Sequence, residues 1–380
     1  MILGINASRA RSGGARAHLV GVLSEADPAA YGFREVHVWS YQGLLDALPD
    51  RPWLVRHTAA PLERGLAAQI LWERFALPGA FRAVKGDVLL NVDAGTVARV
   101  KPAVTMSRDM LSYEPGETTR YGHDARWLRI VALRYLQNRS LRAAQGAVFL
   151  TRYAGEVIQQ SAGRLTNVAY VPHGVGEDFR RNATARPWPV DGERPIECLY
   201  ISPVWHFKHQ WHVVHAIAAL RSEGHDLRIT FAGGGDADAI DRLHAAMAEV
   251  DPKGEFSRHL GHVEHRDLPK LTADADLYIF ASSCENMPNT LLEGMAAGLP
   301  IACSNRGPMP EEIEDGAVLF DPESPPSIAA AVRTILGDDA LRTRIAARAR
   351  ALVGQYSWHR CARETFTFLA QVARASGKPG

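Results

Sequence analysis

The sequence predicts an α/β protein of two doubly wound domains, on three observations. The chain has 380 residues, which is more than a single compact core usually holds. Short apolar runs bounded by turn residues alternate with longer stretches of helical periodicity in both halves. Between the halves, the stretch RNATARPWPVDGERP at 181–195 has three prolines and no periodicity, which is typical of a linker. This alternation predicts parallel sheets covered by helices.

Each half supplies its own set of expected elements, and each is predicted to be a Rossmann-like domain. In the first half, 1–180, strands are expected at 2–6, 36–39, 88–91, 103–107, 147–150 and 168–171, and helices at 62–75 and 126–144. In the second, 196–357, strands are expected at 196–201, 227–232, 277–281 and 301–304, and helices at 210–221, 238–248 and 289–297. Three more helices are expected at 326–336, 340–352 and 358–375.

The charge is distributed unevenly along the chain. The formal net charge is +1, yet residues 1–190 contain 24 Lys and Arg against 16 Asp and Glu, so the remainder is acidic. A basic half attracts phosphorylated ligands or anionic lipid. Nucleic acid is not expected as a partner, because the chain has no helix-turn-helix, zinc-finger or RNP-type motif.

Composition predicts a cytoplasmic protein. No stretch approaches 18 consecutive apolar residues, and the N-terminus MILGINASRARSGG begins as a strand rather than as a signal peptide. The four cysteines are widely spaced and form no CxxC pair. We expect them to be small buried side chains rather than disulfides or zinc ligands.

The stretch SSCENMPNTLLEGMAAGLP, residues 282–300, follows a predicted strand and begins a helix. Pro288 suits a helix start, where a missing N–H costs little. Three backbone amides are then expected to be free for an anion such as a diphosphate, those of Asn289, Thr290 and Leu291. Glu293 and Glu285 can accept hydrogen bonds from hydroxyl groups on either side of that anion. The pattern suits a nucleoside diphosphate sugar, and two solvated glutamates are the alternative interpretation.

A resemblance extends this interpretation. Glu285, seven residues and Glu293 are followed by GMAAGLPIACSNRGPMPEEIEDGAVLFDP. The combination resembles the signature of the family 4 retaining glycosyltransferases of GT-B fold, strongly over about 165–360 and weakly before. It implies two Rossmann-like domains facing across a cleft, with the acceptor in 1–180 and the nucleotide sugar in 196–357. It also implies that the final helix, 358–380, packs back on the first domain.

The resemblance also assigns donor-side roles. It implies that Glu293 binds the ribose, Glu285 the donor sugar, and Lys208, in ISPVWHFKHQ, the diphosphate. Pro203 stands where the family commonly has an arginine, so two alternatives are open: fewer phosphate ligands here, or an arginine supplied from elsewhere in the chain. LGHV, with His262 and Val263, resembles the edge that holds the base. The remaining donor-side candidates are Gly13 and Gly14, in the stretch SGGA at 12–15 that resembles the family's N-terminal glycine loop.

The first half departs from the family's pattern. Many members have His-Asp after the strand at 103–107, and here the pair is Arg108-Asp109. Arg108, Asp109 and His123 are the candidate acceptor-side residues, and Asp109 joins Glu285 and Lys208 as a candidate catalytic residue. YVPHGV places His173 where the family usually has Asn, and we expect that turn histidine to be structural.

The expected reaction is transfer of a hexose from a nucleoside diphosphate sugar to a glycan acceptor, with retention of configuration. The expected acceptor is lipid-linked and belongs to cell-surface polysaccharide synthesis. No metal cofactor is expected, because Asp236-Ala-Asp238 suits a helix start and Asp274-Ala-Asp276 precedes a buried strand. Two alternatives stay open, a nucleotide-sugar epimerase of the same fold and a non-catalytic nucleotide-binding module. A dinucleotide-dependent oxidoreductase is disfavoured, because SGGARA lacks the GxGxxG pattern.

Residues 120–142, RYGHDARWLRIVALRYLQNRSLR, are a candidate for contact with an anionic membrane surface. They contain six arginines, one acid, two tyrosines and a tryptophan. A basic amphipathic helix with aromatic residues can lie on anionic lipid. The alternative is a solvated helix face packed on its own sheet. Membrane contact would give a peripheral location on the inner face of the cell membrane.

Overall fold

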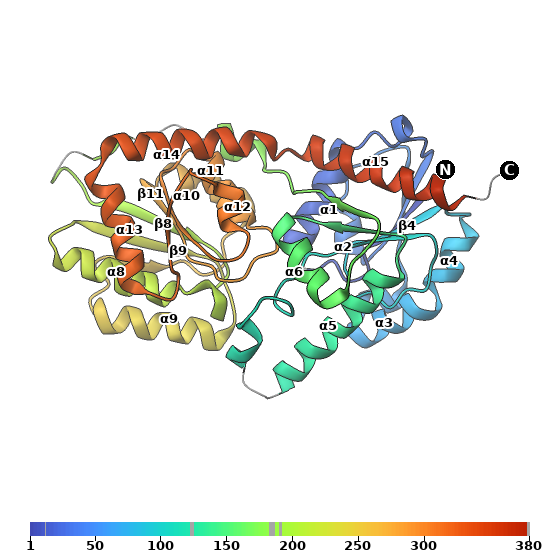
Figure 1. Ribbon diagram of the computed structural model, residues 1–380, viewed down its shortest axis with the longest axis horizontal. Helices are drawn as coiled ribbons and strands as arrows, with labels where there is room; N and C mark the ends of the chain where they lie inside the picture. The colour runs from blue at the N-terminus through green and yellow to red at the C-terminus, as the bar shows by residue number, and fades with distance from the viewer. Residues whose placement is uncertain (12, 122–124, 182–186, 190–191, 378–380) are drawn as a thin grey trace. The chain divides into compact units, whose positions relative to one another are not determined.

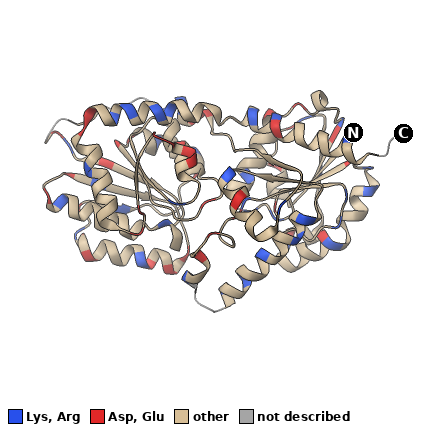
Figure 2. Cartoon of the chain, viewed as in Figure 1, with Lys and Arg blue, Asp and Glu red and all other residues tan. Residues whose placement is uncertain are grey.

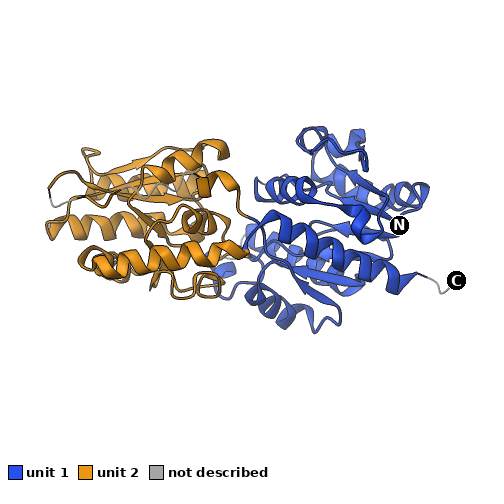
Figure 3. Cartoon of the chain, turned by 90° about the horizontal axis from the view of Figure 1, so that it is seen from above, with its two compact units in different colours: residues 1–174, 356–380 blue, residues 175–355 orange. Residues whose placement is uncertain are grey.

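The computed structural model describes residues 1–11, 13–121, 125–181, 187–189 and 192–377 (Figure 1). The chain divides into two compact units (Figure 3): unit 1 is Met1–Gly174 with Tyr356–Gly380, and unit 2 is Val175–Gln355. The first boundary therefore lies ahead of the predicted linker at 181–195. Residues 182–186 and 190–191 of that linker lie outside the described residues.

Unit 1 contains a parallel sheet in the order β3-β2-β1-β4-β5-β6-β7. Its strands are β1 (Ile2–Asn6), β2 (Glu35–Trp39), β3 (Leu54–His57), β4 (Val88–Asn91), β5 (Ala103–Met106), β6 (Gly146–Phe149) and β7 (Val168–Tyr170). Strands β1, β4, β5 and β6 are buried at every position, as expected when helices cover both faces of a parallel sheet. The α/β prediction is confirmed.

The helices of unit 1 come from both ends of the chain. They are α1 (Gly13–Glu25), α2 (Gln42–Leu45), α3 (Leu66–Phe75), α4 (Leu77–Ala83), α5 (Ala125–Ala143), α6 (Arg152–Ala162) and α15 (Trp358–Ser376). Helix α15 packs closely on α1, since a Cβ atom added to Gly21 would lie 2.3 Å from the Trp358 ring. Short 3-10 turns are η1 (Pro28–Tyr31), η2 (Ala60–Glu63) and η3 (Glu117–Tyr121).

Unit 2 repeats the parallel arrangement, in the order β10-β9-β8-β11-β12-β13. Its strands are β8 (Ile196–Ile201), β9 (Leu227–Ala232), β10 (Ser257–His259), β11 (Leu277–Phe280), β12 (Ile301–Ser304) and β13 (Val318–Phe320). Its core is aromatic at the centre of the sheet, where the Tyr200 ring lies 6.2 Å from Phe231 and 5.8 Å from Phe280. All three side chains are fully buried.

The helices of unit 2 are mostly those that the periodicity predicts. They are α7 (Glu177–Arg181), α8 (Gln210–Ser222), α9 (Ala237–Val250), α10 (Leu268–Ala273), α11 (Asn289–Ala296), α12 (Met309–Ile313), α13 (Pro325–Gly337) and α14 (Asp339–Leu352). Short 3-10 turns are η4 (His206–Lys208), η5 (His265–Asp267) and η6 (Val353–Gln355). Side-chain caps explain where helices of both units begin, because an N-cap oxygen satisfies an amide that has no helical partner. Ser324 caps α13 and Ser357 caps α15 in this way.

The charge of α5 and the hydropathy of the described helices bear on the expected contact with a membrane. Figure 2 shows basic positions along α5, whose described sequence has five arginines and no acidic residue. Within the part of the chain that the structure describes, no helix combines the length and apolar character needed to cross a bilayer.

Candidate functional site

Both sheets reverse their strand order beside the first strand, and polar side chains gather at these points. Strand β1 lies between β2 and β4, and β8 lies between β9 and β11. In doubly wound sheets, ligands bind at the carboxyl ends of the strands beside such a reversal. We call these two places the unit 1 and unit 2 switch points. At the first, Asn6 ends β1, and Arg108 and Asp109 follow β5. At the second, Lys208 follows β8 and Glu285 follows β11.

An ion pair occupies the unit 2 switch point. Lys208 ends η4, and its Nζ contacts Oε1 of Glu285 in the loop after β11. The two side chains are only 6% and 13% exposed, so solvent screens the pair weakly. The ammonium also lies 5.5 Å from the centre of the Phe280 ring. A fixed cation at this point can meet an incoming phosphate without first being ordered.

Backbone contacts fix both partners of this pair. The carbonyl of Lys208 accepts a hydrogen bond from Tyr200 Oη at 2.7 Å. The amide of Ser283 donates to the Phe207 carbonyl at 2.8 Å, which ties the loop of Glu285 to η4. His209 follows Lys208 with φ 50°, in the left-handed region, and so turns the chain into α8.

Glu293 lies on α11 and is paired with a residue that the sequence did not single out. Its Oε1 lies 2.9 Å from His265 Nε2, and its Oε2 is buried without a hydrogen-bond partner among the described residues. Burial raises the pKa of Glu293, against the hydrogen bond and charge of His265. The same hydrogen bond raises the pKa of His265, against its own desolvation. The unpartnered oxygen is the kind of acceptor that a ligand hydroxyl satisfies.

The expectation of three free amides at the start of α11 is wrong for two of them. The amide of Asn289 donates to the Met287 carbonyl at 3.0 Å, and that of Leu291 donates to the Pro288 carbonyl at 3.0 Å. Pro288 is the N-cap rather than the first helical residue, so its carbonyl accepts from the Leu291 amide, and the Asn289 amide is taken by the carbonyl two residues before it. Any anion site here depends on Thr290 and on side chains.

Packing explains glycines of the turn AGGGD at 232–236 but says nothing of a role for His262 and Val263, at the expected base edge. A Cβ atom at Gly233 would lie 2.2 Å from the Ser202 carbonyl oxygen, and one at Gly235 would lie 2.1 Å from that of Val204. Close backbone approach therefore accounts for Gly233 and Gly235 of AGGGD, whereas a Cβ atom at Gly234 would meet nothing nearer than 3.7 Å. His262 is exposed and contacts Glu264 at 3.3 Å, and Val263 is half-buried.

The unit 1 switch point contains a cavity of about 260 Å³. Its lining includes both residues of the predicted pair, Arg108 and Asp109, and the glycine-loop residue Ala15. Asp109 Oδ1 accepts a hydrogen bond from the Leu111 amide at 3.1 Å, and Oδ2 accepts one from Gln137 Nε2 at 3.3 Å. Burial raises the pKa of Asp109, and these hydrogen bonds oppose the rise.

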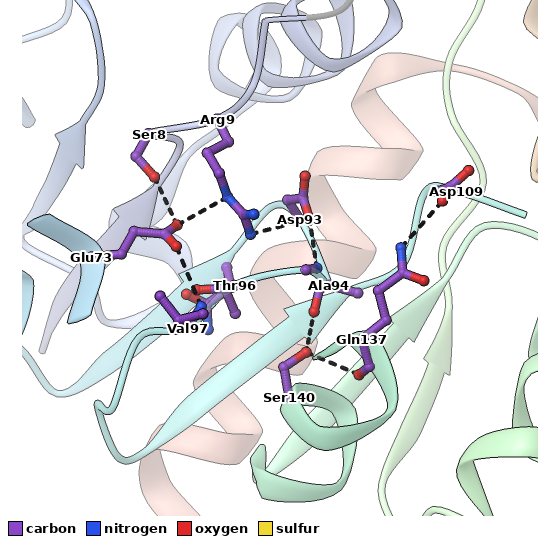
Figure 4. Close-up of polar contacts among 12 residues, drawn as sticks. Ser8, Arg9, Glu73, Asp93, Ala94, Thr96, Val97, Asp109, Gln137 and Ser140 are labelled. Atoms are coloured by element: carbon purple, nitrogen blue, oxygen red, sulfur yellow. Dashed lines mark hydrogen bonds and ion pairs between the residues drawn. The ribbon is translucent and has the colours of Figure 1, made fainter. Parts of the chain in front are cut away.

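A buried polar network supports one wall of this cavity (Figure 4). Glu73 Oε1 accepts a hydrogen bond from Ser8 Oγ at 2.8 Å. The same oxygen accepts one from Asn6 Nδ2 at 2.9 Å. Arg9 lies between Glu73 and Asp93, 3.5 Å from each carboxylate. The charge of Arg9 is therefore compensated within the network.

The glycine loop and the predicted turn histidine lie close to the same switch point. A Cβ atom at Gly13 would meet nothing within 4 Å, so packing does not require a glycine there. His173 is buried and stacks on His18 of α1, with ring centres 4.5 Å apart. The Trp358 ring centre lies 5.9 Å from that of His173. Ser12 and His123 lie outside the described residues.

Comparisons with known proteins agree with this geometry. Residues 188–352, which contain Lys208, Glu285 and Glu293, match the family model described as "Glycosyl transferases group 1". The chain is 36% identical over 119 residues to the O-antigen chain mannosyltransferase B of Escherichia coli, covering 31% of each chain. It is 27% identical over 267 residues to a GDP-mannose-dependent alpha-(1-6)-phosphatidylinositol monomannoside mannosyltransferase of Mycobacterium tuberculosis, covering 66% of this chain and 68% of that one. The chain spans 31% of the length of the first relative and 50% of a glycogen synthase of M. tuberculosis.

Solved structures identify the fold. The chain superimposes on sucrose-phosphate synthase from Thermosynechococcus elongatus with a TM-score of 0.77 at 16% identity, over 99% of this chain and 100% of that chain. The TM-score to WaaG, a glycosyltransferase involved in lipopolysaccharide biosynthesis, is 0.67 at 15% identity, over 97% and 99% of the chains. The fold is that of the GT-B glycosyltransferases. Anabaena HepE, in complex with UDP-glucose, also matches, with a TM-score of 0.71 at 17% identity over 99% of both chains.

Within this GT-B fold, three side chains important to the switch points escaped sequence analysis. His265 pairs with Glu293 across 28 residues, Glu73 joins β1 to α3, and Gln137 orients Asp109 from α5. Only the run LGHVEH, with histidines beside the expected base edge, offered a local signal for His265. Among the described residues, no three His, Cys, Asp or Glu side chains gather as a metal site.

Proposed function

We propose that the protein is a retaining glycosyltransferase that transfers a hexose from a nucleoside diphosphate sugar to a glycan acceptor without a metal ion. The observation that carries the proposal is the buried ion pair between Lys208 and Glu285 at the unit 2 switch point. Glu285 stands eight residues before Glu293 in the sequence. The Glu-x7-Glu spacing is the basis for assigning it to family 4. The group 1 match over 188–352 and the GT-B fold support the same reaction class.

In this proposal, the residues of unit 2 bind the donor. Lys208 neutralises the diphosphate, Glu285 accepts hydrogen bonds from the sugar hydroxyls, and Glu293 Oε2 accepts one from the ribose. His265 holds the other oxygen of Glu293 and so fixes the direction of the free one. The base lies along His262 and Val263. When the donor binds, its phosphate replaces Glu285 as the ion-pair partner of Lys208, and the Glu285 carboxylate then accepts hydrogen bonds from the sugar.

The chemical step needs little covalent chemistry from the protein. The bond from the sugar C1 to the diphosphate oxygen breaks, and a bond from C1 to the acceptor hydroxyl oxygen forms on the same face. The proton of that hydroxyl passes to the departing diphosphate. Lys208 stabilises the negative charge that develops on the leaving group, which is the largest contribution expected of a side chain here.

A turnover assay tests the proposal and separates it from its rivals. Release of nucleoside diphosphate from UDP-glucose and GDP-mannose is measured in EDTA, with and without a lipid extract as acceptor source. A transferase releases nucleotide only when acceptor is present, whereas an epimerase converts donor without acceptor. Glu285→Ala is expected to lower turnover at least about 100-fold with little change in nucleotide affinity. A protein that binds nucleotide and turns over no donor under any of these conditions is a binding module instead.

The proposal includes contact of unit 1 with an anionic bilayer, which would bring it to a lipid-linked acceptor. Helix α5 exposes Leu128 and Tyr135, which are 62% and 69% exposed, and α3 exposes Phe75, which is 72% exposed. Desolvation lowers the pKa of Arg74 on α3, and the positive charges of Arg99 and Arg139 lower it further. These three cations therefore lie close together. Exposed apolar side chains beside clustered cations suit an anionic lipid surface.

Sedimentation with vesicles tests this contact. The protein is expected to bind vesicles of phosphatidylcholine with phosphatidylserine, to release them at high salt, and to bind phosphatidylcholine alone weakly. Phe75→Ser with Tyr135→Ser should reduce binding, whereas Leu319→Ser, an exposed apolar residue of unit 2, serves as the matched control. Binding that ignores both salt and the double substitution would exclude this surface.

A further inference from the structure

The cavity at the unit 1 switch point contains a half-buried cation, Arg108, which has no partner among the residues that the structure describes. Arg108 makes no hydrogen bond or ion pair with any described residue, and its Nε and Nη1 are buried. Burying a charge without hydrogen bonds is costly, so such a side chain usually has a partner that completes it. Arg108 lines the cavity, so its guanidinium is available to a ligand there.

None of the described groups around Arg108 forms an ion pair or a hydrogen bond with its guanidinium. Asp93 attracts the guanidinium from a distance, and the Cys361 thiol and His18 are further neighbours. Desolvation nevertheless lowers the pKa of Arg108 to about 10, so it stays charged at neutral pH. Asp93 is committed elsewhere, since its Oδ1 accepts a hydrogen bond from the Gly95 amide at 2.6 Å and pairs with Arg9.

The other arginine of the cavity provides an internal comparison. Arg9 lies between two carboxylates, those of Glu73 and Asp93 (Figure 4). Arg108 has no carboxylate within ion-pair distance among the described residues. An oxyanion in the cavity would therefore bind to Arg108 rather than to Arg9, and the planar guanidinium can hold a carboxylate or phosphate through two parallel hydrogen bonds.

Asp109 adds a second requirement on the ligand. Its carboxylate lines the same cavity and is held by Gln137, whose Oε1 accepts a hydrogen bond from Ser112 Oγ at 2.8 Å. That bond directs the amide NH₂ of Gln137 toward Asp109. Asp109 keeps lone pairs free for a hydroxyl donor. A ligand that satisfies both side chains carries an oxyanion and a hydroxyl group.

We propose that this cavity binds an acidic sugar of the acceptor, with its carboxylate or phosphate on Arg108 and a hydroxyl on Asp109. The inference rests on the proposed function, which it deepens by naming the acceptor class. Arg108 is then a specificity-determining residue. Arg108 stands at the position where members of family 4, which this chain resembles, have histidine. The charge of a histidine changes near neutral pH, whereas arginine stays positively charged.

Calorimetric titration with matched probes tests the inference without any transfer reaction. Glucuronate and glucose 1-phosphate are compared with glucuronamide and methyl glucoside, which have similar shapes and no negative charge. The protein is expected to bind at least one acidic probe at least ten-fold more tightly than its neutral counterpart. The tighter of the two acidic probes shows whether the oxyanion is a carboxylate or a phosphate. Equal affinity for acidic and neutral probes would overturn the inference, and this comparison needs no variant.

Substitutions then locate the binding. Arg108→Met should remove the preference for acidic probes, Arg108→Lys should retain part of it, and the exposed Arg129→Met of α5 should leave it unchanged. Undiminished preference in Arg108→Met would show that the oxyanion binds elsewhere.

A parallel titration with UDP and GDP separates this inference from the proposed function. Arg108→Met should leave nucleotide affinity unchanged, and a comparable loss of nucleotide affinity would assign Arg108 to the donor diphosphate and overturn the acceptor site. If the protein binds the acidic probes but no nucleotide, the proposed function is refuted. The preference of the cavity for acidic over neutral sugars would still hold.

Discussion

The two switch points have the same topology and opposite electrostatic states. At the unit 2 switch point, Lys208 is paired with Glu285 in a buried site. At the unit 1 switch point, Arg108 has no partner among the described residues. In the proposed function, the ion pair keeps Lys208 in place for the diphosphate of each donor molecule. Arg108, which has no counter-ion among the described residues, would instead select a ligand that carries its own negative charge. The same fold can thus build two anion sites by different routes.

The largest effect is expected from breaking the pair in unit 2. Lys208→Met leaves Glu285 buried without its counter-ion and removes the cation for the diphosphate. Nucleoside diphosphate affinity should fall at least about 100-fold, and the free energy of unfolding should fall by about 3 kcal/mol. Calorimetry and urea unfolding measure the two effects. Lys253→Met, at a lysine whose side chain is 81% exposed, is the control and should change neither.

A smaller effect is expected at Glu293, which sharpens the view that unit 2 is the donor side. Glu293→Ala removes the carboxylate proposed to bind the ribose, and nucleotide affinity should fall by about ten-fold, with turnover at saturating donor little changed. Steady-state kinetics separate KM from kcat. A large loss of kcat with unchanged KM would mean that the roles of Glu285 and Glu293 are exchanged.

The third prediction contrasts the two switch points directly. Arg108→Met replaces an uncompensated buried cation by an apolar side chain of similar length, so the free energy of unfolding should rise by about 1 kcal/mol in the absence of ligand. Lys208→Met should act in the opposite direction. Destabilisation by Arg108→Met would show that a charge compensates Arg108 in the free protein and would break the comparison.

The smallest effect concerns pH. The pKa of His265 is raised by its hydrogen bond to Glu293, so the protonated form stabilises the folded state. This contribution is fully present below the ordinary histidine pKa of about 6.5 and is lost as pH rises through the raised value. The stability difference between the wild-type protein and His265→Asn should therefore shrink as pH rises above about 6.5. A constant difference over this range would mean that the pair contributes no proton linkage.

Sequence analysis placed the central strands better than the edges. Strands β8, β9 and β12 have the predicted bounds, because buried central strands are continuous apolar runs. Strands β3, β10 and β13 were not predicted. They are edge strands of three or four residues with exposed or half-buried positions. LVRH and SRH carry no apolar run, and the apolar VLF of β13 is only three residues long.

The candidate site was predictable only in part, for a related reason. Local spacing indicated Glu285 and Glu293, and position after a strand indicated Lys208. Pairing is not local, since Lys208 contacts Glu285 across 77 residues and Glu293 contacts His265 across 28. The free amides of α11 were mispredicted because the pattern does not distinguish a proline at the N-cap from one inside the helix.

The proposed function requires a nucleotide site at the unit 2 switch point that works without metal. Calorimetric titration of the protein with UDP, GDP, ADP and dTDP in EDTA tests it most directly, with Lys208→Met measured in parallel. We expect one nucleotide to bind clearly and the variant to lose that binding. Binding that appears only when Mg²⁺ or Mn²⁺ is restored, or that survives in Lys208→Met, would contradict the account.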